Sequence, residues 1–196
     1  MQLDMSFLPD GVSGNWSVST FEVTEEDLSQ KISMFKTGRW VPPGVYKKLS
    51  RNGFAVMTNT PDEIRDFTHF TRKACGSILI NGLGLGCVVK VLLEKPEVTK
   101  ITVIEKSEDV IKLVSPHFND SRLTIIHADA FEYVPPKGER YDFAWHDIWD
   151  YICAENLKEM TKLHRKYGRR INQWQDSWAK YLCQKAEKES KKYSYF

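Results

Sequence analysis

The sequence predicts a mixed α/β fold with a parallel sheet at its core, and three observations support this prediction. First, residues 78–86 read ILINGLGLG, an apolar run that breaks into alternating glycines ahead of a helical pattern at 87–93. Second, the apolar run 101–104 ends on the acidic residue Glu105. Third, strand and helix patterns alternate from there, and each strand pattern ends in polar residues. A buried parallel strand, a glycine turn and a helix open nucleotide-binding α/β sheets, which bind ligands at the carboxyl ends of their strands.

An N-terminal α/β extension is expected ahead of this core, over residues 1–75. A capping-box-like pattern at Thr24 indicates a short helix, whereas two prolines and two glycines predict a turn-rich loop at 38–46. Residues 54–57 favour a short strand. Thr60 is the expected N-cap of a helix that has proline at its first position and leads into the first core strand.

The core, residues 76–150, continues as alternating elements. Ser107 is the expected N-cap of the helix that follows the second strand, and two acidic residues in its first turn complement the helix dipole. Residues 123–126 and 141–145 predict the third and fourth strands. Four parallel strands are therefore expected in this part of the chain.

The C-terminal part, residues 151–184, is predicted to be helical throughout. Apolar residues recur at helical spacing from Leu157 to Tyr167, and Gly168 is the expected C-cap. Residues 185–196 are charged and have no clear apolar face, so we expect this tail to fray. A second amphipathic helix is predicted from Ile171, Trp174, Trp178 and Leu182.

The spacing of the glycines narrows the choice of ligand. Glycine lets the backbone turn sharply and lie close to a ligand, because no Cβ obstructs it. A dinucleotide fingerprint reads G-x-G-x-x-G, but Cys87 stands where its third glycine belongs. Glu105 lies about 20 residues past the glycines, where an acidic side chain can accept both hydroxyls of a ribose. An acid after a strand also commonly begins a helix, which is the alternative role of Glu105.

Residues 76–150 resemble the core of the class I S-adenosylmethionine-dependent methyltransferases, and most of all the spermidine synthase branch. The G-x-G-x-G turn resembles motif I of the methyltransferases. The segments 101–105, 107–111, 120–123 and 128–131 are similar to patterns that recur in the spermidine synthase branch. The resemblance implies a Rossmann-like sheet of strand order 3-2-1-4, numbered along the core, and S-adenosyl-L-methionine as the cofactor.

The resemblance also implies roles for individual residues. Glu105 would hold the ribose, Asp129 the adenine amino group, and the three glycines of the turn the methionine moiety. Asp147 takes the place of the catalytic carboxylate, where it would act as a general base or orient an acceptor. The implied cofactor-binding residues are Asn81, Gly82, Leu83, Gly84, Gly86, Glu105, Lys106, Asp129 and Ala130.

Asp147 has a second interpretation, in which it caps the helix that starts near Asp150 or pairs with an arginine. Side chains alternate along extended backbone, so Trp145 and Asp147 should share one side while His146 packs on the other. We therefore expect His146 to be a packed, hydrogen-bonded histidine. Trp145 or Trp149 beside a sulfonium would add cation–π attraction.

The chain departs from the family in two respects. Ile148 and Trp149 follow Asp147, where the branch has a polar, proline-containing loop. Only 46 residues follow Asp150, whereas class I methyltransferases continue through several more strands. The resemblance therefore implies a core truncated after its fourth strand, with C-terminal helices in place of the last strands.

Length and composition agree with a single domain, residues 1–196. A chain of 196 residues with 41% hydrophobic content can bury one substantial core and is too short for two domains of normal size. No apolar run of about 18 residues is present, so no membrane span is expected. A cytoplasmic protein with free thiols is expected, because the N-terminus lacks a secretory pattern and the four cysteines lack C-x-x-C spacing. The five histidines show no metal-ligand spacing.

A basic cluster at the end of the first C-terminal helix has two interpretations. Together with Trp174 and Trp178 it could hold a phosphate backbone and stack bases, which would make nucleic acid a partner. Alternatively, the helix dipole favours cations at this end and the tryptophans face the core. The cluster consists of Lys162, His164, Arg165, Lys166, Arg169 and Arg170.

Three functions are compatible with these features. The leading hypothesis is a methyltransferase of unidentified acceptor, in which Asp147 orients or deprotonates an amine or hydroxyl. The second is aminopropyl transfer to a polyamine, which needs several acids, whereas the sequence near Asp147 is apolar. The third is a non-catalytic cofactor binder whose C-terminal helices serve a protein or nucleic-acid partner.

Two structural questions remain open at this point. Residues 39–66 either cover the site or pack as an ordinary first layer. Exposed sheet edges suggest a homo-oligomer, unless the helices after Asp150 cover an edge.

Overall fold

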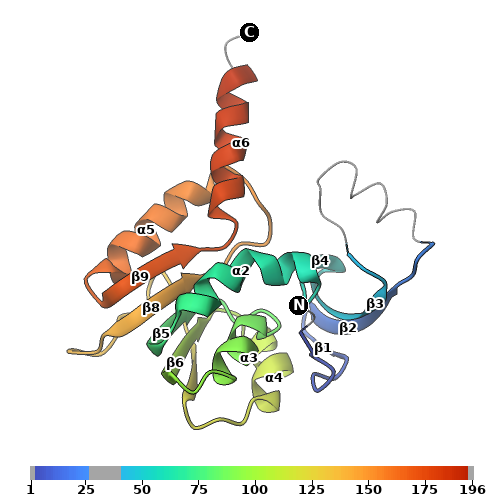
Figure 1. Cartoon of the computed structure of the whole chain (residues 1–196), viewed down its shortest axis with the longest axis horizontal. Coiled ribbons are helices and arrows are strands. Elements are labelled where there is room, and N and C mark those ends of the chain that lie inside the picture. Colours follow the sequence, from blue (N-terminus) through green and yellow to red (C-terminus); the bar gives the residue numbers. More distant parts are fainter. Residues whose placement is uncertain (1–2, 27–40, 194–196) are drawn as a thin grey trace.

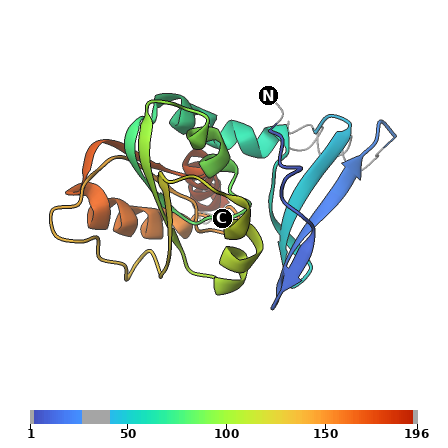
Figure 2. The ribbon, with the colours of Figure 1, turned by 90° about the horizontal axis from the view of Figure 1, so that it is seen from below.

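The computed structural model describes residues 3–26 and 41–193, and it contains two separate β-sheets. Figure 2 shows the N-terminal sheet standing beside the core sheet rather than in line with it. The N-terminal sheet has four antiparallel strands in the order β1-β2-β3-β4. These strands are β1 (Gly11–Ser13), β2 (Trp16–Val23), β3 (Gly44–Arg51) and β4 (Phe54–Thr58).

The core sheet has five parallel strands in the order β7-β6-β5-β8-β9. Helix α2 (Pro61–Lys73) joins the two sheets, and Figure 1 shows α3 and α4 on one side of the core sheet and α5 on the other. The remaining elements are β5 (Gly76–Asn81), α3 (Cys87–Leu93), β6 (Val98–Glu105), α4 (Glu108–Val114), a 3₁₀ turn at Ser115–His117, β7 (Leu123–His127), β8 (Tyr141–His146), α5 (Asn156–Gly168), β9 (Ile171–Ser177) and α6 (Lys180–Tyr193).

The predicted α/β fold is confirmed, including the strand order 3-2-1-4 that β7, β6, β5 and β8 adopt. The helix starts are also confirmed at two places. Thr60 precedes a helix with Pro61 in its first turn, and the Ser107 side chain accepts a hydrogen bond from the Val110 amide. The expected N-terminal extension contains a complete four-stranded sheet of its own.

The prediction that helices replace all later strands is wrong, because Ile171–Ser177 forms the fifth strand, β9. Ile171, Trp174 and Trp178 do recur at helical spacing, but β9 lies at the sheet edge and only Ser177 in it is fully buried. An edge strand that buries little shows no two-residue alternation, so pairing with β8 decides its structure. The core is therefore not truncated after its fourth strand.

One smaller expectation also needs correction. The predicted turn-rich loop at 38–46 ends earlier, since Val45 and Tyr46 belong to β3 and pair with β2 along its whole length. The tail that is predicted to fray belongs to α6 as far as Tyr193, and Figure 1 shows this helix projecting from the body of the molecule. The apolar side of the helix predicted from Thr24 lies outside the described residues.

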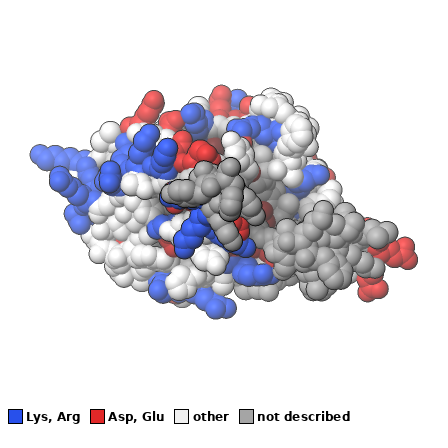
Figure 3. Space-filling view, turned by 90° about the horizontal axis from the view of Figure 1, so that it is seen from above, with Lys and Arg blue, Asp and Glu red and all other residues white. Residues whose placement is uncertain are grey.

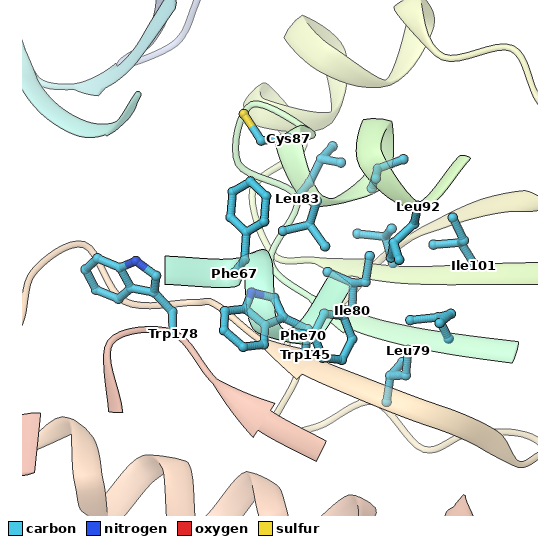
Figure 4. Packing of buried hydrophobic residues seen from close by; sticks show 14 of the residues in the cluster. Phe67, Phe70, Leu79, Ile80, Leu83, Cys87, Leu92, Ile101, Trp145 and Trp178 are labelled. Carbon is cyan, nitrogen blue, oxygen red and sulfur yellow. The ribbon is translucent and has the colours of Figure 1, made fainter. Parts of the chain in front are cut away.

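The core packs on both faces of the parallel sheet. Ile78, Leu79 and Ile80 of β5 are at most 1% exposed, because neighbouring strands and helices cover them on all sides. Figure 4 shows Phe70 of α2 beside Trp145 of β8, and their ring centroids are 5.1 Å apart. This packing holds α2 over the carboxyl half of the sheet, where the polar strand ends lie.

Two sequence expectations concern the whole chain. All four cysteines are free, with Cys87 and Cys183 buried and Cys75 and Cys153 half-buried. Among the residues that the structure describes, no helix is long and apolar enough to cross a bilayer.

Candidate functional site

A cavity of about 790 Å³ opens at the carboxyl ends of β5, β6 and β8, which is where open α/β sheets bind ligands. Its volume falls within the range of about 300–1,000 Å³ that is usual for small-molecule sites. One wall is the core sheet with its following loops, and the facing wall comes from the N-terminal sheet. Of the predicted site residues, it is lined by Gly82, Leu83, Gly84, Glu105, Lys106, Asp129, Ala130 and Asp147.

The glycine turn is shaped by close contacts with other parts of the chain. Gly82 has a φ of 95°, and a Cβ there would lie 1.9 Å from the main-chain oxygen of Asp147. Gly84 has a φ of 53°, and a Cβ there would lie 2.5 Å from Sδ of Met57. Gly82 therefore requires glycine for both backbone conformation and space, whereas Gly84 requires it for backbone conformation, because the flexible Met57 side chain can shift. The Asp147 amide also donates to the Asn81 carbonyl (2.8 Å), which joins the ends of β5 and β8.

Glu105 links the glycine turn to the start of α4. Its Oε2 accepts a hydrogen bond from the Leu83 amide and its Oε1 accepts one from the Ser107 amide, both at 2.7 Å. The side chain is 9% exposed and lines the cavity. A carboxylate can accept about four hydrogen bonds, so Glu105 keeps acceptor capacity for the hydroxyls of a ligand.

Asp129 and Lys106 form an ion pair on the cavity wall, with Nζ and Oδ2 2.7 Å apart. The Phe131 amide donates to the other carboxylate oxygen of Asp129 (2.7 Å). The hydrogen bond from Lys106 is the main cause that lowers the pKa of Asp129, and the same contact raises the pKa of Lys106. Asp129 is therefore ionised at neutral pH and fixed in orientation.

Asp147 lies at the inner end of the cavity. The pKa of its carboxyl is raised to about 7, chiefly by burial and in smaller part by the neighbouring carboxylates Asp66 and Glu105, while a hydrogen bond with the Trp145 indole lowers it. Trp145 is 2% exposed, and its indole nitrogen lies beside the Asp147 carboxyl. Asp147 can therefore exchange a proton near neutral pH, which a general base requires.

His146 lies on the opposite side of β8, as the alternation of side chains predicted. The Asn81 amide nitrogen donates to its Nδ1 (2.7 Å), which leaves the Nε2 hydrogen to donate to Oε1 of Gln175 (3.1 Å). Burial lowers the pKa of His146 to about 3, so the ring is neutral. Asn81 is fully buried in this network and does not line the cavity, although the resemblance implied cofactor contact.

Gly86 is the other predicted residue that the structure does not bring to the cavity. A Cβ at Gly86 would lie 2.5 Å from the ring of Phe118. Its role in the described structure is to let that ring pack against the start of α3.

Much of the cavity wall comes from residues that sequence reasoning did not single out. Trp16, Arg51 and Met57 of the N-terminal sheet lie on it, so part of the segment 39–66 does form a wall of the site. Arg51 forms an ion pair with Asp150 and lies over the Trp16 ring, 5.3 Å from its centroid. No local pattern could reveal these contacts, because they join strands far apart in the chain. On the opposite side the wall includes Trp149, Glu155, Glu159 and Trp178.

The cavity is strongly acidic. Its two basic residues, Arg51 and Lys106, are both paired with lining carboxylates. The sequence next to Asp147 is apolar, but most of the acids that line the cavity with it come from other elements. The lining carboxylates are Glu63, Glu105, Asp129, Asp147, Asp150, Glu155 and Glu159.

The predicted basic cluster lies at the other end of the sheet. It ends at Arg170, directly before the amino end of β9, and Figure 3 shows Lys and Arg gathered at the corresponding end of the molecule. Arg170 donates to the carbonyls of Pro136 and Glu139, so part of the cluster has a structural role. Trp178 lies on the cavity instead, at the opposite end of β9, so it cannot stack bases beside the cluster.

Comparisons with known proteins give the fold but no close relative. No protein-family model matches the chain, and no curated protein matches its sequence. The chain is similar to the spermidine synthase from Thermotoga maritima, with a TM-score of 0.50, 20% identity, and coverage of 84% of this chain and 52% of that one. The fold is therefore that of the Rossmann-like methyltransferases.

Methyltransferase structures are among the other matches. CcbJ from Streptomyces caelestis has a TM-score of 0.45 and 17% identity, covering 57% of this chain and 46% of that one. The plantazolicin methyltransferase BpumL, solved in complex with SAH, has a TM-score of 0.41 and 16% identity, covering 56% and 42%. The chain spans about half of the length of the solved structures it matches. Membership in the spermidine synthase branch is not supported by these likenesses.

Proposed function

We propose that the protein is an S-adenosylmethionine-dependent methyltransferase. The observation that carries this proposal is the combination of a glycine turn, an acid at the end of β6 and an acidic cavity at the strand ends. A sulfonium donor is a cation and suits such a cavity. A nicotinamide dinucleotide carries an anionic pyrophosphate, which seven carboxylates would repel while both basic residues are already paired.

The residues present suit S-adenosylmethionine in three places. Glu105 has acceptor capacity for the ribose hydroxyls, and Gly82 and Gly84 leave the backbone accessible from the cavity. Asp129 is ionised and held by Lys106, and it can accept a hydrogen bond from an adenine amino group. The indoles of Trp145 and Trp149 lie on the same cavity and can face a sulfonium.

The main contribution of the protein would be to align the methyl donor with the acceptor. When bound, S-adenosylmethionine supplies a methyl group that the positive sulfur activates for displacement. The walls from the two sheets exclude water and hold donor and acceptor in line. Asp147, whose pKa lies near 7, takes up the proton that the acceptor releases.

A binding measurement tests the cofactor assignment. S-adenosylhomocysteine is expected to raise the melting temperature, whereas NADH is not. Glu105→Ala is expected to weaken S-adenosylhomocysteine binding by about 1–3 kcal/mol in calorimetric titration, because hydrogen bonds to a charged group are lost. Glu108→Ala is the matched control, since this acid lies on the exposed surface of α4 and pairs with Lys112. Absence of any thermal shift with S-adenosylhomocysteine would overturn the proposal.

Aminopropyl transfer is the second candidate, and the acidic lining of the cavity favours it. The objection that such a site needs several acids no longer applies. Turnover with S-adenosylmethionine and with its decarboxylated form, each offered with the same amine, separates the two reactions. The non-catalytic alternative loses much of its support, because β9 supplies the fifth strand whose absence motivated it.

A further inference from the structure

Aromatic side chains border the half of the cavity that faces α5. Three indoles lie on it, from Trp145, Trp149 and Trp178, and each is at most 9% exposed. Figure 4 shows Trp145 and Trp178 near the carboxyl end of β8, away from the aliphatic core around Leu92 and Ile101. Three indoles therefore border this part of the cavity.

Carboxylates stand at both ends of this aromatic wall. Asp147 lies at the inner end, and Glu159 lies at the exposed mouth. The indole nitrogen of Trp149 donates to Oε2 of Glu159 (2.7 Å), which fixes the orientation of that carboxylate. Among the described residues, no ion pair joins Asp147 or Glu159 to a basic side chain.

The loop that carries these groups is held in place by its own hydrogen bonds. The Asn156 amide nitrogen donates to the Tyr151 carbonyl (2.7 Å), and the Cys153 thiol donates to Oδ1 of Asn156 (3.0 Å). Asn156 is 6% exposed and begins α5. These hydrogen bonds hold the segment between Trp149 and the start of α5 in a defined conformation.

Trp145 also contributes a polar group beside Asp147. Its buried indole nitrogen faces the Asp147 carboxyl, and this contact favours the ionised form of the acid. A group bound to Asp147 would draw its carboxylate into a fixed position against this donor.

We propose that this half of the cavity binds the methyl acceptor, and that the acceptor is an organic amine with an apolar body, bound as its ammonium ion. This inference rests on the proposed function and names the substrate class of the same site. Aromatic faces attract ammonium groups and accommodate apolar bodies, and the carboxylates supply the opposite charge. Phosphate-bearing acceptors are excluded by the same carboxylates.

Methyl transfer at this site begins with a proton transfer. Asp147 accepts a proton from the ammonium ion, which frees the nitrogen lone pair. That lone pair forms a bond to the methyl carbon as the carbon–sulfur bond breaks, and the electrons of the broken bond remain on sulfur. The products are a methylated ammonium ion and a neutral thioether, and Asp147 returns its proton to solvent.

A calorimetric titration on the full chain tests the inference. The protein is saturated with S-adenosylhomocysteine and titrated with 2-phenylethylamine, which is protonated at neutral pH, or with its neutral analogue 2-phenylethanol. The amine is expected to bind at least about tenfold more tightly than the alcohol, since a charged hydrogen bond is worth about 1.5–3 kcal/mol. Equal affinities for the two compounds would overturn the inference.

Two variants test where in the cavity the amine binds. Asp147→Asn is expected to weaken amine binding at least tenfold and Glu159→Gln about threefold, the second being smaller because Glu159 is exposed. Glu189→Gln, an exposed acid on α6 outside the cavity, is the matched control and should change nothing. Each variant must retain S-adenosylhomocysteine affinity within about twofold, which shows that it is folded.

The outcomes separate this inference from the function on which it rests. Binding of S-adenosylhomocysteine without binding of the amine, or amine binding that neither cavity variant weakens, overturns the inference and leaves the methyltransferase proposal standing. Failure of S-adenosylhomocysteine to bind overturns the methyltransferase proposal, and the role of methyl acceptor with it.

Discussion

At the scale of single residues, the ionisation of Asp147 affects both the stability of the fold and the proposed reaction. Its carboxyl is half-buried beside other acids, and burial together with these acids raises its pKa to about 7, so ionisation of Asp147 destabilises the folded protein. In the unfolded chain the same group ionises near 3.8. The folded state therefore holds a proton that the unfolded state has lost between about pH 4 and 7, and stability falls as the pH rises through that window.

Asp147→Asn should remove this pH dependence. The variant is expected to match the parent near pH 4 and to become more stable as the pH rises, with the difference levelling off above pH 7. The gain above pH 7 should be roughly 1–4 kcal/mol, from about 1.4 kcal/mol per unit of pKa shift. Urea denaturation at several pH values measures it.

Asp142 provides the contrasting control for this prediction. It accepts a hydrogen bond from the Ser77 amide (2.9 Å), which is the main cause that lowers its pKa. A lowered pKa stabilises the fold above the unfolded value and is lost as the pH falls, so Asp142→Asn should lower stability at neutral pH. Parallel curves for the Asp147→Asn variant and the parent between pH 4 and 7 would contradict the role given to Asp147.

At the scale of elements, the glycine turn was the part of the site most accessible from sequence. The glycine spacing predicted the strand, the turn and α3. The position of Glu105 after the next strand pattern predicted that this acid lies near the turn. The sequence could not distinguish glycines that face a ligand from glycines that face the protein, because both have the same backbone freedom. Gly82 is required by the backbone of Asp147 and Gly86 by Phe118.

Gly82→Ala should therefore disrupt the junction of β5 and β8. The new Cβ would lie 1.9 Å from a main-chain oxygen, and the φ of 95° disfavours alanine. Strain of this kind costs about 1–3 kcal/mol from the backbone alone, and the clash adds to it. Chemical denaturation is expected to show a loss of roughly 3 kcal/mol or more.

Gly138→Ala is the matched control for the glycine turn. Gly138 has a similar φ of 86°, but nothing lies within 4 Å of a Cβ there. Its cost should be limited to the conformational strain, about 1 kcal/mol. Equal losses in the two variants would show that the contact with Asp147 does not govern Gly82.

After Asp150, the spacing of apolar residues does not predict every element correctly. The helix α5 and the start of α6 follow the expected amphipathic spacing, but β9 between them was mistaken for helix. An edge strand with mixed exposure gives no clean alternation, and Trp174 and Trp178 happen to lie four positions apart. Only pairing with β8 reveals the strand, and that pairing depends on residues about 30 positions earlier.

At the scale of the whole molecule, the cavity exists because two sheets face each other. The core sheet supplies the residues that sequence reasoning identified, and the N-terminal sheet supplies Trp16, Arg51 and Met57. Contacts between strands separated by many residues leave no local signal, so the facing wall could be anticipated only as one of two roles for residues 39–66. The acidic character of the site was missed for the same reason.

The ion pair of Arg51 and Asp150 joins the two sheets across the cavity mouth. Because both side chains reach solvent, the pair should contribute about 0.2–1 kcal/mol. A double-mutant cycle with Arg51→Met and Asp150→Asn, measured by urea denaturation, is expected to show this coupling at low salt. In 1 M NaCl the coupling should largely vanish, because the screening length falls to about 3 Å.

The stability of each single variant supplies the control for this cycle, since Arg51→Met also removes the contact with the Trp16 ring. Coupling that persists unchanged in high salt would mean that the two residues interact through packing rather than charge.

The carboxylates that line the cavity outnumber its basic side chains, so the carboxyl edge of the core sheet carries a negative potential. A small cation that comes near this edge is attracted toward the cavity before it touches the protein. Long-range attraction of this kind speeds capture far more than it prolongs residence, and salt screens it, so the ionic strength of the surrounding solution sets how quickly the cavity fills.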